Sequence, residues 1–114
     1  EAVMVYRLRQ TSGNDWYSGT VVKRNGEAET LRAVDILFEP IEQVEVKTGK
    51  LMSRNLPLRW RLELPGKDKR WIIDAPEPDH WLNTTFPYWE GPVKVIDPQT
   101  GSTVGEGYLE MTGY

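Results

Sequence analysis

Residues 56–64 read Leu56-Pro57-Leu58-Arg59-Trp60-Arg61-Leu62-Glu63-Leu64, and this stretch decides the fold class of the 114-residue chain. Every second residue from Leu56 onward is large and apolar, and all but one of the residues between them are charged. A β-strand sends alternate side chains to opposite faces, whereas a helix would scatter these residues around its circumference. The stretch therefore predicts a strand that points its apolar face into a core, with Arg59 and Arg61 on the other face.

The same period of two recurs along the chain. In residues 4–9 one face is apolar and the other basic, with Met4, Tyr6 and Leu8 set against Arg7 and Arg9. Further strand candidates, separated by turns rich in Gly, Pro, Asn and Asp, are residues 18–23, 29–38, 43–47, 69–75, 88–96 and 103–112. Residues 27–35 fit a short helix as well as a strand. Short strands at regular spacing predict an all-β antiparallel sheet, sandwich or barrel.

Composition excludes several classes of function. The chain has no cysteine, which rules out disulfides, thiolate metal sites and a cysteine nucleophile. The net charge of −3 gives no electrostatic case for nucleic acid or for an anionic membrane. No apolar run approaches the roughly 18 residues of a membrane-spanning helix. His80 is the only histidine and has no clustered partners, so we expect neither a metal nor a cofactor.

The length fits one domain, and the chain begins with Glu1 rather than methionine. We therefore expect a piece of a longer protein. No signal peptide is visible in these residues.

The last residues predict a hairpin that carries two carboxylates. Residues 88–96 and 103–112 are its strands, and residues 97–102 form the loop. Alternation places Glu90 and Glu110 on one face, each with a tyrosine, Tyr88 or Tyr108, two positions earlier. A solvated outer face is one interpretation of this pattern. The glycines around the two carboxylates favour close approach of another group, which predicts that both are at least partly shielded from solvent.

Aromatic residues crowd together just before and within this hairpin. Trp81, Phe86, Tyr88 and Trp89 fall within nine residues. Such a cluster is often core, and it can also line an apolar ligand cavity. Both interpretations stay open at this point.

Two terminal segments resemble a known family. The residues YWEGPV at 88–93 and GEGYLEMTGY at 105–114 resemble the closing motifs of the AttH-type, carotenoid 1,2-hydratase-like family, whose members are often labelled predicted secreted hydrolases. Residues 4–9 and 18–21 resemble its M-x-Y-x-L-R and SGT segments. Residues 48–60 resemble its TG-x-x-YP-x-x-W stretch, with Leu56 where the family usually has tyrosine. The resemblance covers nearly the whole chain.

The resemblance implies an all-β fold, either an antiparallel lipocalin-like β-barrel or a strongly curved sheet. It implies that residues 1–114 form a single lipocalin-like domain, the C-terminal half of a two-domain protein. The expected partner is the N-terminal lipocalin-like domain of the same chain, and the expected location is periplasmic or secreted.

The implied function is to hold an apolar small molecule, isoprenoid or lipid-like, for acid-catalysed hydration of an alkene. Glu90 and Glu110 are the catalytic candidates, with a structural role as the alternative. The candidate ligand-binding residues are Tyr88, Trp89, Tyr108 and Trp81. Hydratase activity is expected only together with the N-terminal domain. The alternative is a non-catalytic module that binds such a ligand or supports the other domain.

Overall fold

The computed structural model describes residues 1–114 and is built almost entirely from strands. Two short 3-10 helices, η1 and η2, interrupt nine strands. In chain order the elements are β1 (Ala2–Leu8), β2 (Trp16–Val22), β3 (Ala28–Leu31), η1 (Ala33–Asp35), β4 (Leu37–Gly49), β5 (Met52–Leu64), η2 (Pro65–Lys67), β6 (Lys69–Asp74), β7 (Trp81–Leu82), β8 (Tyr88–Ile96) and β9 (Thr103–Thr112). No helix of the structure has the length and apolar character needed to cross a membrane.

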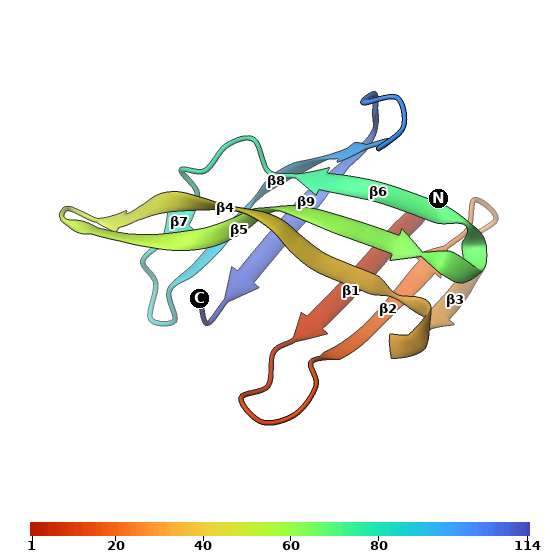
Figure 1. The fold of residues 1–114 in the computed structure, drawn as a ribbon, viewed down its shortest axis with the longest axis horizontal. Coiled ribbons are helices and arrows are strands. Elements are labelled where there is room, and N and C mark those ends of the chain that lie inside the picture. Colours follow the sequence, from red (N-terminus) through yellow and green to blue (C-terminus); the bar gives the residue numbers. More distant parts are fainter. The chain divides into compact units, whose positions relative to one another are not determined.

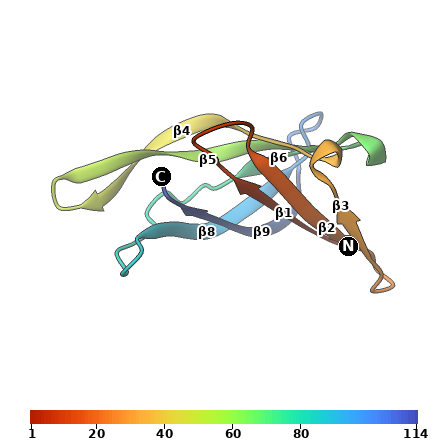
Figure 2. The ribbon, with the colours of Figure 1, turned by 90° about the horizontal axis from the view of Figure 1, so that it is seen from below.

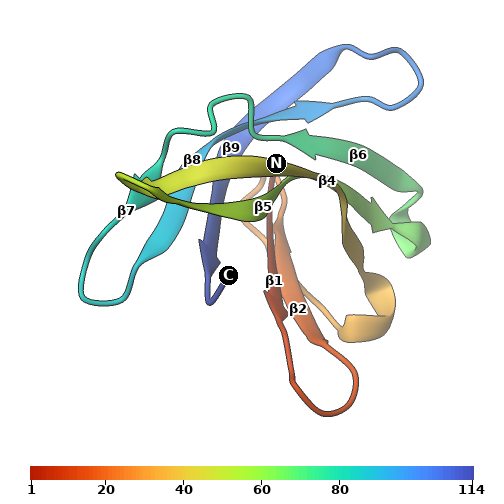
Figure 3. The same cartoon turned by 60° about the vertical axis from the view of Figure 1, so that its left-hand side comes forward.

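The strands form two open sheets. One has three strands in the order β1-β2-β3, and the other has the order β4-β5-β6-β8-β7 with β9 paired to β8 (Figures 1 and 3). The registers of β1–β2, β2–β3, β6–β8, β7–β8 and β8–β9 are all antiparallel. The predicted all-β antiparallel class is confirmed. Neither sheet closes on itself, so hydrogen bonding does not form the barrel that was one of the two expected forms.

The chain separates into two compact units. The first comprises Glu1–Phe38 and Glu63–Lys69 and contains the three-stranded sheet. The second comprises Glu39–Leu62 and Arg70–Tyr114 and contains most of the six-stranded sheet.

Strand β5 has the two faces that its sequence predicts. Its alternate apolar residues are buried, with 0–6% of their surface exposed: Leu56, Leu58, Trp60, Leu62 and Leu64. On the other face Arg59 is half-buried, with its Nη1 3.4 Å from the Asp74 carboxylate, and Arg61 is exposed and bonded to Glu39. The indole N–H of Trp60 donates to the Pro57 carbonyl at 2.8 Å, so its one polar atom is satisfied in the core.

The three-stranded sheet buries one face only. Val21 and Leu31 are 4% and 3% exposed on that face. Gly19 is directly opposite Leu31, and a Cβ there would meet the Met4 carbonyl oxygen at 2.5 Å. The opposite face carries no charged residue and stays exposed; its large side chains are Met4, Tyr6, Leu8, Trp16 and Val22.

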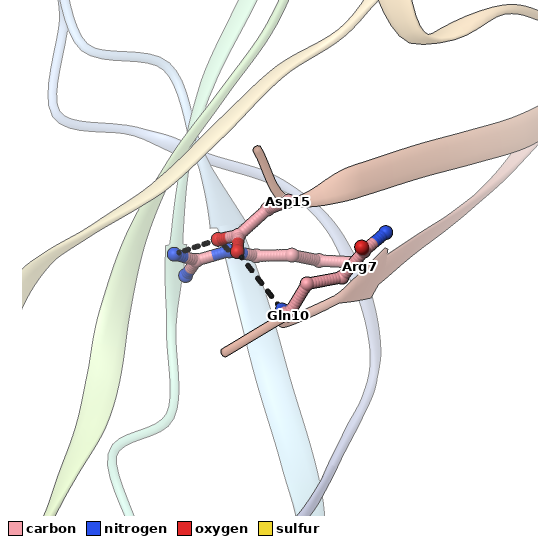
Figure 4. A network of polar contacts seen from close by, with 3 residues as sticks. All are labelled: Arg7, Gln10 and Asp15. Carbon is pink, nitrogen blue, oxygen red and sulfur yellow. Dashed lines mark hydrogen bonds and ion pairs between the residues drawn. The ribbon is translucent and has the colours of Figure 1, made fainter. Parts of the chain in front are cut away.

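An ion pair fixes the connection between β1 and β2. The Arg7 guanidinium donates to Asp15 Oδ2 from Nε at 3.0 Å and from Nη2 at 2.8 Å (Figure 4). The backbone N–H of Gln10 donates to Asp15 Oδ1 at 3.3 Å. The Arg7 hydrogen bonds, followed by the Gln10 N–H, lower the pKa of Asp15 below its usual value. Arg7 therefore lies on the less exposed face of β1, opposite the apolar residues.

The prediction of one continuous strand over residues 29–38 is wrong, because the middle of this segment is not a strand. The chain ends β3 at Leu31, turns through η1 and begins β4 at Leu37. The Asp35 carboxylate accepts the Arg32 backbone N–H at 2.8 Å, which stabilises a local turn in place of a ladder bond. The two-residue strand β7 was not predicted at all, because two residues are too few to show a period.

Candidate functional site

The predicted hairpin of the last residues is confirmed. Strands β8 and β9 pair along their whole length, with Glu90 directly opposite Glu110 and Pro92 opposite Tyr108. In the loop, the Asp97 N–H donates to the Ser102 carbonyl at 2.9 Å and the Gly101 N–H to the Asp97 carbonyl at 2.8 Å. Directly opposed residues share a face of a sheet, so the two carboxylates are neighbours across the strands.

The two carboxylates differ in their exposure. Glu90 and Tyr88 are half-buried on β8, whereas Glu110 is exposed and Tyr108 is 73% exposed on β9. The predicted shielding is therefore right for Glu90 and wrong for Glu110. The reason is the position of β9, which pairs with β8 alone and so lies at an edge of the sheet. Hairpin glycines such as Gly105 and Gly107 meet only ordinary contacts from Val95 and Val93.

The electrostatics of this face are dominated by the acidic pair. Burial raises the pKa of the Tyr88 hydroxyl, and the negative charges of Glu90 and Glu110 and a hydrogen bond with Glu90 raise it further. Like charges placed directly opposite each other destabilise a sheet. Four residues along each strand, Lys94 opposes Glu106, which is a favourable pairing. We name the surface formed by Tyr88, Glu90, Tyr108 and Glu110 the Tyr–Glu face.

Trp89 lies on the other side of the same strand. Its side chain is 0% exposed, and its indole N–H donates to the Pro78 carbonyl at 2.9 Å. The ring covers Gly91, where a Cβ would lie 2.7 Å from Trp89 Cη2, and the His80 ring packs edge-on at 5.9 Å between centroids. The expectation that glycine allows close approach holds at Gly91, where the approaching group is an aromatic ring.

Trp81 is opposite Trp89 in the β7–β8 register and shares its face. The Arg54 guanidinium lies over its ring, 5.3 Å from the centroid, and its indole N–H donates to Asn83 Oδ1 at 2.9 Å. The six predicted site residues therefore form two groups: Tyr88, Glu90, Tyr108 and Glu110 together on one face, and Trp81 and Trp89 on the opposite face.

Arg54 is a residue that the sequence pattern did not single out. Besides covering Trp81, it donates to the backbone carbonyl of Tyr114 and so fastens the last residue of the chain to β5. Next to it, Asn83 Nδ2 donates to the Thr48 carbonyl at 3.0 Å. These contacts join positions far apart in the sequence, and no local spacing signals them.

A solved structure shares this fold. A crystal structure of a candidate AttH protein from Nitrosomonas europaea matches 98% of this chain with a TM-score of 0.76 and 22% sequence identity. The chain covers 34% of that protein, so it spans about a third of the length of its structural relative. No curated protein matches the chain.

The family model described as AttH-like matches residues 1–114, which is the whole chain. This match agrees with the resemblance carried by the terminal motifs, and the chain belongs to the AttH-like family.

Proposed function

We propose that this chain is one part of a longer AttH-type protein that holds an apolar, isoprenoid or lipid-like molecule and hydrates an alkene in it. The observation that carries the proposal is the direct opposition of Glu90 and Glu110, each with a tyrosine nearby. Opposed like charges lower the stability of a hairpin. A local arrangement that costs stability is most often found where function requires it.

The proposed chemistry is a proton transfer followed by addition of water. A carboxylic acid gives its proton to one alkene carbon, the π electron pair forms the new C–H bond, and the other carbon becomes a cation. A water oxygen then bonds to the cation, and the extra proton of that water returns to the carboxylate. Tyrosine ring faces beside the site can stabilise the cation while it exists.

The two carboxylates suit different roles. Glu90 is half-buried beside Tyr88, which favours it as the group that exchanges the proton with the substrate. Glu110 is exposed at the sheet edge, which favours a role in positioning the water. An exposed carboxylate is a poor partner for a carbocation because bulk water competes for it. We therefore propose that another part of the protein covers the Tyr–Glu face and completes the site.

That covering part is the proposed partner of this chain, an N-terminal lipocalin-like domain of the same polypeptide. The support is that the chain spans about a third of its structural relative. Two further points come from the family resemblance. The first is that the chain forms a single lipocalin-like domain with a strongly curved sheet. The second is a periplasmic or secreted location. Tyr88 and Tyr108 are the proposed ligand-binding residues of this site, because Trp81 and Trp89 lie on the opposite face of the sheet.

The test uses the full-length protein with the variants Glu90→Gln and Glu110→Gln. Each is assayed for gain of one water by an acyclic isoprenoid, using mass spectrometry, and for affinity toward a fluorescent polyene. We expect Glu90→Gln to lower hydration by about 100-fold or more while polyene affinity is unchanged. Glu106→Gln is the matched control, because Glu106 shares the strand and face but opposes Lys94. Full hydration by both Glu90→Gln and Glu110→Gln would rule out the catalytic assignment.

A non-catalytic binding module is the second candidate, and a separate observation favours it. The exposed face of the three-stranded sheet is apolar, with Met4, Tyr6, Leu8 and Trp16 between 52% and 59% exposed. Such a patch marks a site for a ligand or for another domain. If Leu8→Asp and Trp16→Asp abolish polyene binding and the wild-type protein hydrates nothing, the module function is the correct one.

A further inference from the structure

Two neighbouring turns expose large apolar side chains to solvent. Leu51 in the β4–β5 turn is 100% exposed, and Met52 beside it is 62% exposed. Phe86, in the connection between β7 and β8, is 83% exposed. We name these three residues the apolar tip. Leu51 and Phe86 are almost wholly outside the packing of the chain, and more than half of the Met52 surface is exposed as well.

Contacts hold the two turns at one end of the six-stranded sheet. Asn83 Nδ2, from the β7–β8 connection, donates to the carbonyl of Thr48 near the end of β4 at 3.0 Å. Arg54 at the start of β5 lies over Trp81 of β7. The β4–β5 hairpin and the β7–β8 connection both lie on the left-hand side in Figures 1 and 2, where the hairpin extends outward and the connection turns downward.

Basic residues flank the β4–β5 turn of the apolar tip. Residues 46–62 contain five basic residues and no acidic residue, and residues 80–89 contain no Asp, Glu, Lys or Arg. Arg59 and Arg61 are paired with Asp74 and Glu39, away from the tip. Lys47 and Lys50 are exposed beside the turn.

Arg54 also lies near the tip, where its guanidinium covers the Trp81 ring and donates to the main-chain oxygen of Tyr114. The net charge of −3 belongs to the whole chain and conceals this local excess of positive charge.

We propose that the apolar tip docks on an anionic phospholipid surface, with Leu51, Met52 and Phe86 entering the headgroup region and Lys47 and Lys50 facing the lipid phosphates. Exposed apolar side chains and basic residues together are what binding at a membrane interface requires. A stable protein complex needs about 20–30 residues on each side, and the tip is far smaller. The inference does not depend on the proposed hydration.

The absence of cysteine allows a direct test of this proposal. An environment-sensitive fluorophore is attached to Leu51→Cys, and to Val34→Cys as the matched control. Val34 is 79% exposed and belongs to η1, remote in the sequence from the tip. On addition of vesicles containing phosphatidylglycerol, we expect a blue shift of the emission from position 51 and no shift from position 34. Absence of a shift at position 51, or equal shifts at both positions, would overturn the proposal.

Vesicle co-sedimentation supplies the second measurement. We expect binding to phosphatidylcholine–phosphatidylglycerol vesicles that weakens as salt is raised, and much weaker binding to phosphatidylcholine alone. The double variants Leu51→Asp/Met52→Asp and Lys47→Glu/Lys50→Glu should each reduce binding about tenfold or more. Because Leu51, Lys47 and Lys50 are exposed, these changes leave the core intact.

Trp16→Asp separates the apolar tip from the other exposed apolar face, and it should leave vesicle binding unchanged. Binding that survives Leu51→Asp/Met52→Asp, or that is lost in Trp16→Asp, would assign the membrane contact to the three-stranded sheet and refute the proposal. Equal binding to both kinds of vesicle would refute the role of the lysines. A requirement for an acidic protein partner would show as no vesicle binding at all, which also refutes it.

Discussion

Strands β5 and β1 carry the same alternating pattern, but the apolar face of β5 is buried and that of β1 is exposed. On β5 the apolar set from Leu56 to Leu64 is 0–6% exposed. On β1 the apolar set, Met4, Tyr6 and Leu8, is 55–59% exposed, and the partly buried side chains are Val3, Val5 and Arg7. Alternation identifies which residues share a face. It does not reveal whether anything covers that face, because cover comes from elements distant in the sequence.

The positions of the two strands explain part of the difference. Strand β5 lies between β4 and β6, so both of its edges are paired within the larger sheet. Strand β1 is the edge strand of a three-stranded sheet and pairs with β2 alone. Its Arg7 turns to the less exposed face because Asp15 is there to receive the guanidinium (Figure 4). An ion pair across a loop thus leaves the apolar side chains of β1 on the exposed face.

The largest expected effect contrasts two tryptophans from these regions. Trp60 is 2% exposed and Trp16 is 52% exposed. We expect Trp60→Ala to lower the free energy of unfolding by about 3–5 kcal/mol, because a buried aromatic ring leaves a cavity and its transfer energy is lost. Trp16→Ala should change it by less than about 1 kcal/mol. Urea denaturation of residues 1–114 measures both, and equal losses would show that the exposed face is packed in solution.

A second contrast concerns two glycines of the β8–β9 hairpin. A Cβ at Gly91 would lie 2.7 Å from Cη2 of the buried Trp89 ring, whereas a Cβ at Gly105 would meet Val95 at an ordinary 3.5 Å. We expect Gly91→Ala to cost about 1–3 kcal/mol, since a ring held in the core cannot move aside freely. Gly105→Ala should be close to neutral. A tolerated Gly91→Ala, seen as an unchanged urea midpoint, would mean that the Trp89 ring can shift.

A third prediction uses pH to test the Arg7–Asp15 pair. The Arg7 hydrogen bonds lower the pKa of Asp15 in the folded chain, so its contribution to stability is present above its unfolded pKa, about 4. That contribution is lost as pH falls through the lower folded pKa. We expect the urea midpoint of the wild type to fall more steeply below pH about 4 than that of Asp15→Asn.

Glu29 and Asp35 also have a lowered pKa in the folded chain, and they titrate in both proteins. The difference between wild type and Asp15→Asn is therefore the informative quantity. Parallel profiles would show that the ion pair is already broken in solution.

The sequence predicts the hairpin much better than the rest of the fold. The bounds of β8 and β9 agree with the predicted strands at 88–96 and 103–112, because alternation, glycines and a short loop all lie within one continuous stretch. The division of the β5 side chains into two faces is equally local information, whereas the burial of one of those faces is not. No periodicity indicates strand β7, the break at η1 or the Arg54–Trp81 contact: β7 has two residues, the break depends on a local bond between Asp35 and Arg32, and the last joins residues far apart in the sequence.

The candidate site shows the same division. That Glu90 and Glu110 share a face follows from the length of the loop and from alternation, and the register confirms it. Glu90 is half-buried and Glu110 is exposed because β9 lies at a sheet edge, and the sequence does not show where the sheet ends. The separation of Trp81 and Trp89 from the Tyr–Glu face requires the register of β7, which was not predicted.

The smallest expected effect on the free energy of unfolding comes from the acidic pair itself. It differs from the effect expected if Glu110 had a stabilising structural role. A shielded Glu110 would lose a hydrogen bond on substitution and cost stability, but Glu110 is exposed and opposes Glu90. We therefore expect Glu110→Gln and Glu90→Gln each to raise the free energy of unfolding slightly, by roughly 0.2–1 kcal/mol, because either one removes the repulsion.

A double-mutant cycle isolates this repulsion from every other effect of the two substitutions. Once Glu110 is neutral, Glu90→Gln has no like charge left to relieve, so the gain in the double variant should be smaller than the sum of the single gains. Glu106→Gln is the control of opposite sign, because it removes an attraction to Lys94 and should lower stability slightly. Urea denaturation at low ionic strength gives all four values, and added salt should shrink them. Additive gains would mean that the carboxylates do not interact, and a loss above about 1 kcal/mol in Glu110→Gln would restore the structural role. A non-additive gain in stability, combined with lost hydration in the full-length protein, is the result that only a functional acidic pair produces.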